Sequence, residues 1–103
     1  MELLYIRESE KSVNEIGERL EVAVKAHQFG VIAVVDLKSK MQEKGVEFER
    51  ACRIYEVCNP HRAKEVLDSD MSISTVLPCR ISVYEDDGKT KVATVSFPEI
   101  RTV

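Results

Sequence analysis

The sequence predicts an α+β fold with two layers, in which a mainly antiparallel sheet carries its helices on one face. Glycine, proline and Asn-Pro signals divide the 103 residues into pieces of strand and helix length. Two of those pieces have apolar residues at helical spacing, and the C-terminal part alternates as a hairpin that needs only one buried face. The expected order is β-α-β-(short α)-β-α-β-β, in a single domain over residues 1–103.

The N-terminal third supplies the first strand, over residues 2–8, and the first main helix. Ser12-Val13-Asn14-Glu15 is a capping box that starts this helix, because the Ser12 hydroxyl and the Glu15 carboxylate can satisfy each other's backbone N–H groups. Gly17 costs about 1 kcal/mol inside a helix relative to alanine, so we expect close packing there. One mostly apolar stripe should face the sheet, formed by Val13, Ile16, Leu20, Ala23 and His27.

The run Val-Ile-Ala-Val-Val at residues 31–35 is unbroken and rich in β-branched side chains. Such a run predicts a central strand that is covered on both faces. Asp36 follows it and can cap a short helix that ends near Gly45, with Leu37 and Met41 facing inward.

Residues 51–58 form the next predicted strand, and a second main helix begins directly after it. Asn59 is expected as its N-cap and Pro60 as its first helical residue, a pair typical of helix starts. Its buried stripe should consist of Ala63, Val66 and Leu67.

The remaining chain is expected to form a hairpin around Asp87-Gly88, in one of two registers. A two-residue loop would place Ile81 opposite Thr94 and mix apolar with polar residues on each face. A three-residue loop with Gly88 in the left-handed region would pair 81 with 93, and we prefer it because it separates the faces. Its dry face would hold Leu77, Cys79, Ile81, Ala93, Val95 and Phe97, and its other face Arg80, Ser82, Tyr84, Thr90, Val92 and Thr94.

Composition limits the classes of partner. The net charge is −3, which argues against nucleic acid because binding to a phosphate backbone needs a basic face. No apolar run approaches the ~20 residues that span a bilayer, so we expect no membrane partner. The three cysteines are odd in number and form no CxxC pair, which favours a cytoplasmic location.

Two segments carry a resemblance to a known family. Cys58-Asn59-Pro60-His61-Arg62-Ala63 is one, and Leu77-Pro78-Cys79-Arg80-Ile81-Ser82-Val83-Tyr84-Glu85 is the other. With Phe29-Gly30-Val31 and Lys44-Gly45, they resemble domain-of-unknown-function family 302 over nearly the whole chain. The resemblance implies a small α+β fold like that of the TATA-binding protein, usually found as a homodimer. It implies no settled activity and no catalytic residues.

Cys58 precedes a helix start, where the positive end of the helix dipole favours a thiolate. This position suits a reactive or sulfur-carrying cysteine, with Cys79 as a resolving partner; the alternative is that both thiols simply close the core. The spacing of the cysteines and histidines supports no metal site, and nothing in the sequence indicates a cofactor.

His61 and Arg62 occupy the first turn of the second main helix, where acidic side chains are usual. An anion would compensate these two basic groups, with Asn59 and Arg80 as further candidates for its binding site; the alternative is that both side chains point into water. Arg80 and Tyr84 also suit a dimer contact.

Two functions therefore stay open. The first is a non-catalytic homodimeric module that binds a small anionic ligand. The second is a thiol-based redox or sulfur-handling protein that uses Cys58. The chain has none of the common nucleotide-binding, metalloprotease or hydrolase motifs, so we lean against enzymatic activity.

Overall fold

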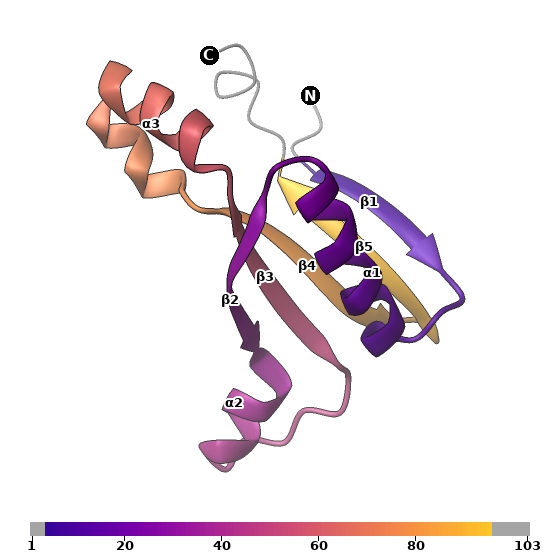
Figure 1. Cartoon of the computed structure of the whole chain (residues 1–103). Coiled ribbons are helices and arrows are strands. Elements are labelled where there is room, and N and C mark those ends of the chain that lie inside the picture. Colours follow the sequence, from indigo (N-terminus) through magenta and orange to yellow (C-terminus); the bar gives the residue numbers. More distant parts are fainter. Residues whose placement is uncertain (1–3, 96–103) are drawn as a thin grey trace.

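The computed structural model describes residues 4–95, which form a five-stranded sheet with helices (Figure 1). The strand order is β1-β5-β4-β3-β2, and every neighbouring pair is antiparallel. The predicted α+β fold and the predicted order of elements are confirmed. The elements are β1 (Leu4–Ser9), α1 (Val13–Ala26), β2 (Gly30–Asp36), α2 (Leu37–Glu43), β3 (Cys52–Cys58), α3 (Pro60–Ser69), the 3₁₀ helix η1 (Met71–Val76), β4 (Cys79–Asp86) and β5 (Lys89–Val95).

Helix α1 forms the second layer and begins as its cap predicts. The Ser12 hydroxyl accepts the Glu15 N–H at 3.1 Å, whereas the Glu15 carboxylate pairs with Lys11 and Arg19 rather than closing the capping box. The core lies between α1 and the middle of the sheet, and Val83 is its most deeply buried side chain. Its other buried members are Val13, Val24, Tyr55 and Val57.

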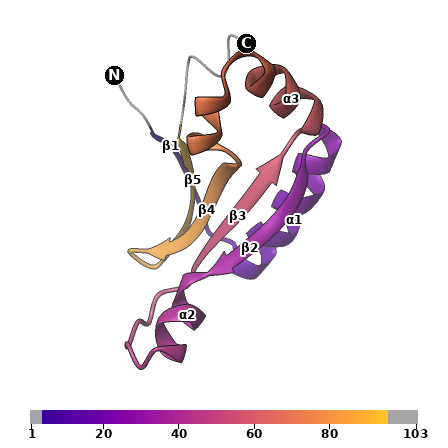
Figure 2. The ribbon, with the colours of Figure 1, turned by 90° about the vertical axis from the view of Figure 1, so that its left-hand side faces the viewer.

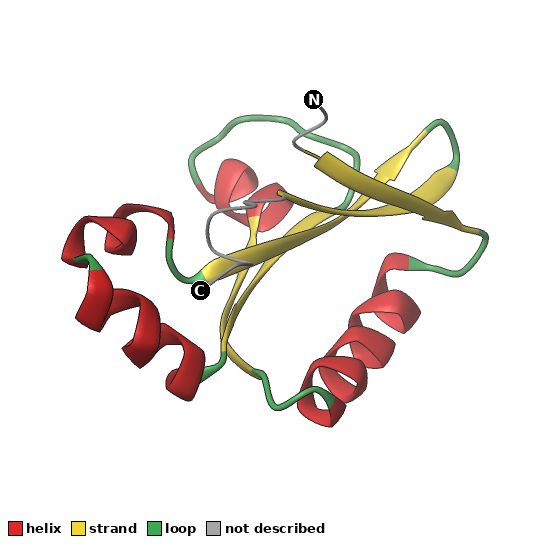
Figure 3. Cartoon of the chain, turned by 90° about the horizontal axis from the view of Figure 1, so that it is seen from above, coloured by secondary structure: helices red, strands yellow, loops and turns green. Residues whose placement is uncertain are grey.

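The other helices lie beyond the ends of the strands. Figure 2 shows α2 below one end of the sheet and α3 above the opposite end. Seen from above, α1 runs along one side of the sheet, while α3 and η1 project away from it (Figure 3). This arrangement leaves the end of β3 and the start of β4 next to α3, where the candidate site lies.

The strand over 31–35 is not central, so that prediction is wrong. Within residues 4–95, β2 pairs only with β3 and forms an edge of the sheet, with a bulge between Val31 and Ala33. Ile32 is 61% exposed and Val34 is 47% exposed. An apolar run reports the chemistry of a strand's two faces, but it does not report whether both of its edges find a partner. Here β4 takes the central position, because it pairs with both β3 and β5.

The hairpin adopts the two-residue register, so the preferred three-residue register is also wrong. Ile81 lies opposite Thr94, and Asp86 lies opposite Lys89. Asp87 and Gly88 have φ angles of 53° and 74°, and a loop with two left-handed residues matches the twist of the strands it joins.

Compared with the predicted register, the observed register places each residue of β5 on the opposite face of the sheet. Thr90 and Val92 lie on the core face, and Thr90 is only 5% exposed. The core accepts Thr94 because its hydroxyl donates a hydrogen bond to the Arg80 carbonyl at 2.8 Å. Ala93 and Val95 therefore share the opposite face with Arg80, while Phe97, predicted for the dry face, lies outside the described residues.

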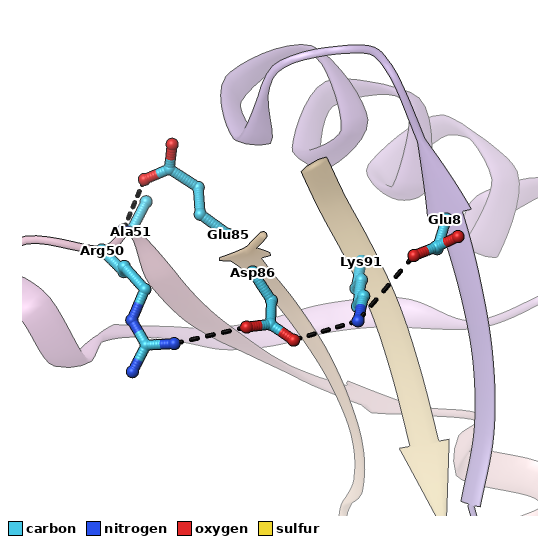
Figure 4. A network of polar contacts seen from close by, with 6 residues as sticks. All are labelled: Glu8, Arg50, Ala51, Glu85, Asp86 and Lys91. Carbon is cyan, nitrogen blue, oxygen red and sulfur yellow. Dashed lines mark hydrogen bonds and ion pairs between the residues drawn. The ribbon is translucent and has the colours of Figure 1, made fainter. Parts of the chain in front are cut away.

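A polar network joins the turn end of this hairpin to its neighbours (Figure 4). Lys91 Nζ lies 2.9 Å from Asp86 and 3.8 Å from Glu8, and Arg50 reaches Asp86 at 3.4 Å. The bond from Lys91 lowers the pKa of Asp86, and the same bond raises the pKa of Lys91. The network thus connects β1, β5, β4 and the segment before β3.

Candidate functional site

A pocket of about 200 Å³ opens beside α3, where β3 ends and β4 begins. Most of its wall is apolar, which is typical of sites for small organic molecules. Residues from three separate stretches of the chain contribute, so the pocket exists only in the folded chain. Its lining consists of Phe29, Val57, Cys58, Asn59, Arg62, Ala63, Val66, Leu77, Pro78 and Cys79.

Asn59 and Pro60 start α3 as predicted. The Asn59 side-chain oxygen accepts the backbone N–H groups of His61 and Arg62, at 3.1 and 3.2 Å. Two of the free N–H groups at this end of α3 are therefore already bonded to the cap and not available to an anion. An anion at this end of α3 would depend mainly on side chains.

Arg62 is the one residue with a charged side chain among the residues that line this pocket. Within residues 4–95, the structure contains no ion pair that involves the Arg62 guanidinium. His61 is exposed and does not contribute to the pocket lining. Arg62 is exposed as well, but of the two basic residues only Arg62 belongs to the pocket lining.

Arg80, the other predicted anion ligand, lies elsewhere. Its Nε is 3.3 Å from the carboxylate of Glu56, its cross-strand neighbour on the opposite face of the sheet from Cys79. It lines a second pocket that shares Pro78 and Cys79 with the first. Among the pockets formed by residues 4–95 described here, Arg62 and Arg80 line different ones.

Both candidate thiols border the first pocket. Cys58 ends β3, and Cys79 starts β4 opposite Val57. Burial raises the pKa of Cys79, and the charge of Cys58 raises that pKa further. Cys79 is therefore a neutral thiol at neutral pH, which suits an apolar wall better than an attacking nucleophile. Cys52 starts β3 at the far end of the strand.

Metal-binding groups do not gather in the described part of the chain. Residues 4–95 contain no cluster of three or more histidine, cysteine or acidic side chains that could hold a metal ion. Over the same residues, no helix is long and apolar enough to cross a membrane.

The sequence did not reveal a further hollow between α1 and the sheet, which is open to solvent at the exposed residues Ala23 and His27 and which we call the cavity beneath α1. It measures about 290 Å³ and shares Phe29, Val57 and Cys79 with the pocket beside α3. His27, which we assigned to the end of the α1 stripe, lies at its wall. A local pattern could not indicate this cavity, because its wall is built from Ala23, Val24, His27, Phe29, Val57, Cys79, Ile81 and Thr94.

Comparisons with known proteins agree with the fold. A search of curated proteins finds no match. The crystal structure of an uncharacterized conserved protein, DUF302, from Bacillus stearothermophilus superposes with a TM-score of 0.88 at 36% sequence identity, covering 91% of this chain and 73% of that chain. The family model described as "Domain of unknown function DUF302" matches residues 5–101. The resemblance carried by the segments at 58–63 and 77–85 is confirmed, and the chain belongs to the DUF302 family.

Proposed function

We propose that this protein is a cytoplasmic, non-catalytic homodimeric module that binds a small organic anion in the pocket beside α3. The observation that carries the proposal is the position of Arg62, a cation at the wall of an otherwise apolar pocket. A ligand with one carboxylate or phosphate and an apolar body would satisfy both features. Charge-assisted hydrogen bonds from guanidinium to such oxyanions are stronger than neutral ones.

Arg62→Gln tests this site directly. We expect small carboxylates to stabilise the wild-type protein in a thermal-shift titration, and we expect their affinity to fall at least about 10-fold in Arg62→Gln, because a hydrogen bond to a charged group contributes about 1.5–3 kcal/mol. Isothermal titration calorimetry with butyrate and with inorganic phosphate measures the loss.

Two matched variants separate Arg62 from general charge effects. Lys64→Gln removes a positive charge from the same helix, but from a side chain that pairs with Asp68 at 2.6 Å and does not line the pocket. Arg80→Gln removes the cation of the neighbouring pocket. Equal losses in all three variants would show non-specific attraction and would contradict the assigned site.

The exposed edge of the sheet supports the homodimer. β2 presents Ile32 and Val34 to solvent along an edge that pairs with no other strand of residues 4–95. Strand edges of this kind are usually covered or blunted with charge. A second copy could pair with this edge antiparallel about Ala33, which would set Ile32 opposite the second copy's Val34 and give the self-complementary contact that a two-fold axis needs.

Thiol chemistry is the second candidate, because Cys58 and Cys79 border the same pocket. In this function Cys58 would be oxidised by a peroxide and Cys79 would resolve it to a disulfide, releasing water. Iodoacetamide labelling across pH, with Cys52 as the internal comparison, tests it. Thiol chemistry would be contradicted if Cys58 labels no faster than Cys52 and if peroxide treatment causes no mass loss of two hydrogens.

A further inference from the structure

The pocket beside α3 and the cavity beneath α1 lie side by side, and both have mostly apolar walls. They share Phe29, Val57 and Cys79 as walls. Val57 and Cys79 are a cross-strand pair in the sheet ladder, so their positions are held by the strands on both sides. Phe29 belongs to neither strand and follows Gln28, whose φ is 67°, in the link between α1 and β2. The Phe29 side chain therefore lines both spaces from the link between α1 and β2, outside the sheet ladder.

The two spaces differ in chemistry. Arg62 is the cation among the residues that line the pocket beside α3. In the cavity beneath α1 the polar groups are His27, which is exposed, and Thr94, whose hydroxyl already donates to the Arg80 carbonyl. Between them the walls are apolar, through Val57, Ile81 and the aliphatic face of α1 at Ala23 and Val24.

From this geometry we infer that the ligand is an unbranched aliphatic monocarboxylate, whose carboxylate pairs with Arg62 and whose chain passes Phe29 into the cavity beneath α1. The inference rests on the proposed function and adds the ligand's length and direction. The cavities measure about 200 and 290 Å³, and together they reach the size range of about 300–1,000 Å³ that is usual for small-molecule sites. A small anion such as phosphate would fill only the first.

A series of carboxylates of increasing length provides the test. Calorimetric titration uses butyrate, hexanoate, octanoate and decanoate, each below its critical micelle concentration. Every buried methylene should tighten binding by up to about 4-fold, so the dissociation constant should fall steadily along the series. 1-Octanol lacks the carboxylate and should bind more weakly than octanoate to the wild type, and the difference should disappear in Arg62→Gln.

Ala23→Phe is designed to fill the cavity beneath α1 and leave the first pocket open. Ala23 lines the cavity beneath α1 but not the pocket beside α3. Because Ala23 is exposed, the variant should fold. We expect butyrate binding to stay unchanged and the gain from hexanoate to decanoate to be lost. Val22→Phe, on the adjacent exposed position, is the control and should behave as wild type.

The outcomes separate this inference from the function on which it rests. Butyrate binding that depends on Arg62 but does not tighten with chain length would overturn the inference and leave the anion site standing. A chain-length gain that survives Ala23→Phe would show that the chain does not enter the cavity beneath α1. If no carboxylate responds to Arg62→Gln, both proposals are wrong.

Discussion

Gly17 is a point of close approach between α1 and β3 of the sheet. A β-carbon added there would overlap the hydroxyl of Tyr55 and would lie 3.1 Å from the carbon that carries it. Tyr55 is itself 4% exposed, in the middle of β3, so its ring has little room to move. The sequence-based expectation of close packing at Gly17 is confirmed, and its partner is now identified.

Gly17→Ala should therefore destabilise the protein, although alanine is the better helix former by about 1 kcal/mol. We expect a net loss of about 1–3 kcal/mol in the free energy of unfolding, because overpacking forces Tyr55 out of place. Urea denaturation measures this loss. In a Tyr55→Phe background, which removes the overlapping hydroxyl, the same substitution should cost much less; an equal cost in both backgrounds would contradict the contact.

Single residues at the site were predicted unequally well. Asn59 and Pro60 follow local rules of helix initiation, so the sequence identified them, and the cap bonds confirm the assignment. That Arg62 meets an apolar wall depends on Leu77 and Pro78, which lie beyond the end of α3 and the whole of η1. No local rule brings those segments together.

Among the elements, the hairpin shows how turn geometry can outweigh face separation. The alternation of apolar residues favoured one register, but Asp87 and Gly88 both adopt left-handed conformations and impose the other. The β-branched threonines of β5 tolerate either face, because a threonine hydroxyl can bond to a nearby carbonyl, as Thr94 does. Their presence weakened the sequence signal for register.

The network at the turn end of this hairpin makes a pH-dependent contribution to stability. The pKa of Asp86 lies below its usual value of 3.8, chiefly because of the hydrogen bond from Lys91. A lowered acid pKa contributes stability that is fully present above the unfolded value and is lost as pH falls through the folded one.

Asp86→Asn should remove this acid-sensitive contribution to the free energy of unfolding. We expect the urea midpoint of the wild type to exceed that of the variant near neutral pH, and the difference to shrink as pH falls below about 3.8. In a Lys91→Met background, Asp86→Asn should change the midpoint far less at every pH, since Lys91 is the main cause of the lowered pKa. A wild-type advantage that persists undiminished at the acid end would contradict the assignment.

On the scale of the whole molecule, the chain is less compact than its length predicts. Its radius of gyration is 14.9 Å, whereas a compact domain of this length would have about 13 Å. The helices beyond the two ends of the sheet extend the molecule, and within residues 4–95 the outer edge of β2 pairs with no other strand. The proposed homodimer would cover this edge.

Val34→Lys should therefore separate the proposed dimer. A lysine at the exposed edge would face the second copy across the two-fold axis, and burying the two unpaired charges should weaken association by at least about 100-fold. Light scattering coupled to size-exclusion chromatography, over a dilution series, measures the oligomeric state. Val22→Lys, at a position that is 71% exposed on the outer side of α1, should remain dimeric. A wild type that is monomeric at every concentration would contradict the proposal.

The sequence by itself determined the order of the strands and α-helices and the residues at which the helices begin, because capping, turn chemistry and hydrophobic periodicity act over only a few neighbouring positions; it did not predict η1. Ser12, Asp36 and Asn59 all cap the helices they were expected to cap. The tertiary structure alone decided that β2 lies at the edge, that Ile81 faces Thr94, and that Arg62 and Arg80 belong to different pockets. These outcomes depend on pairings between distant segments, whose free energies come from the whole sheet and not from any local run of residues.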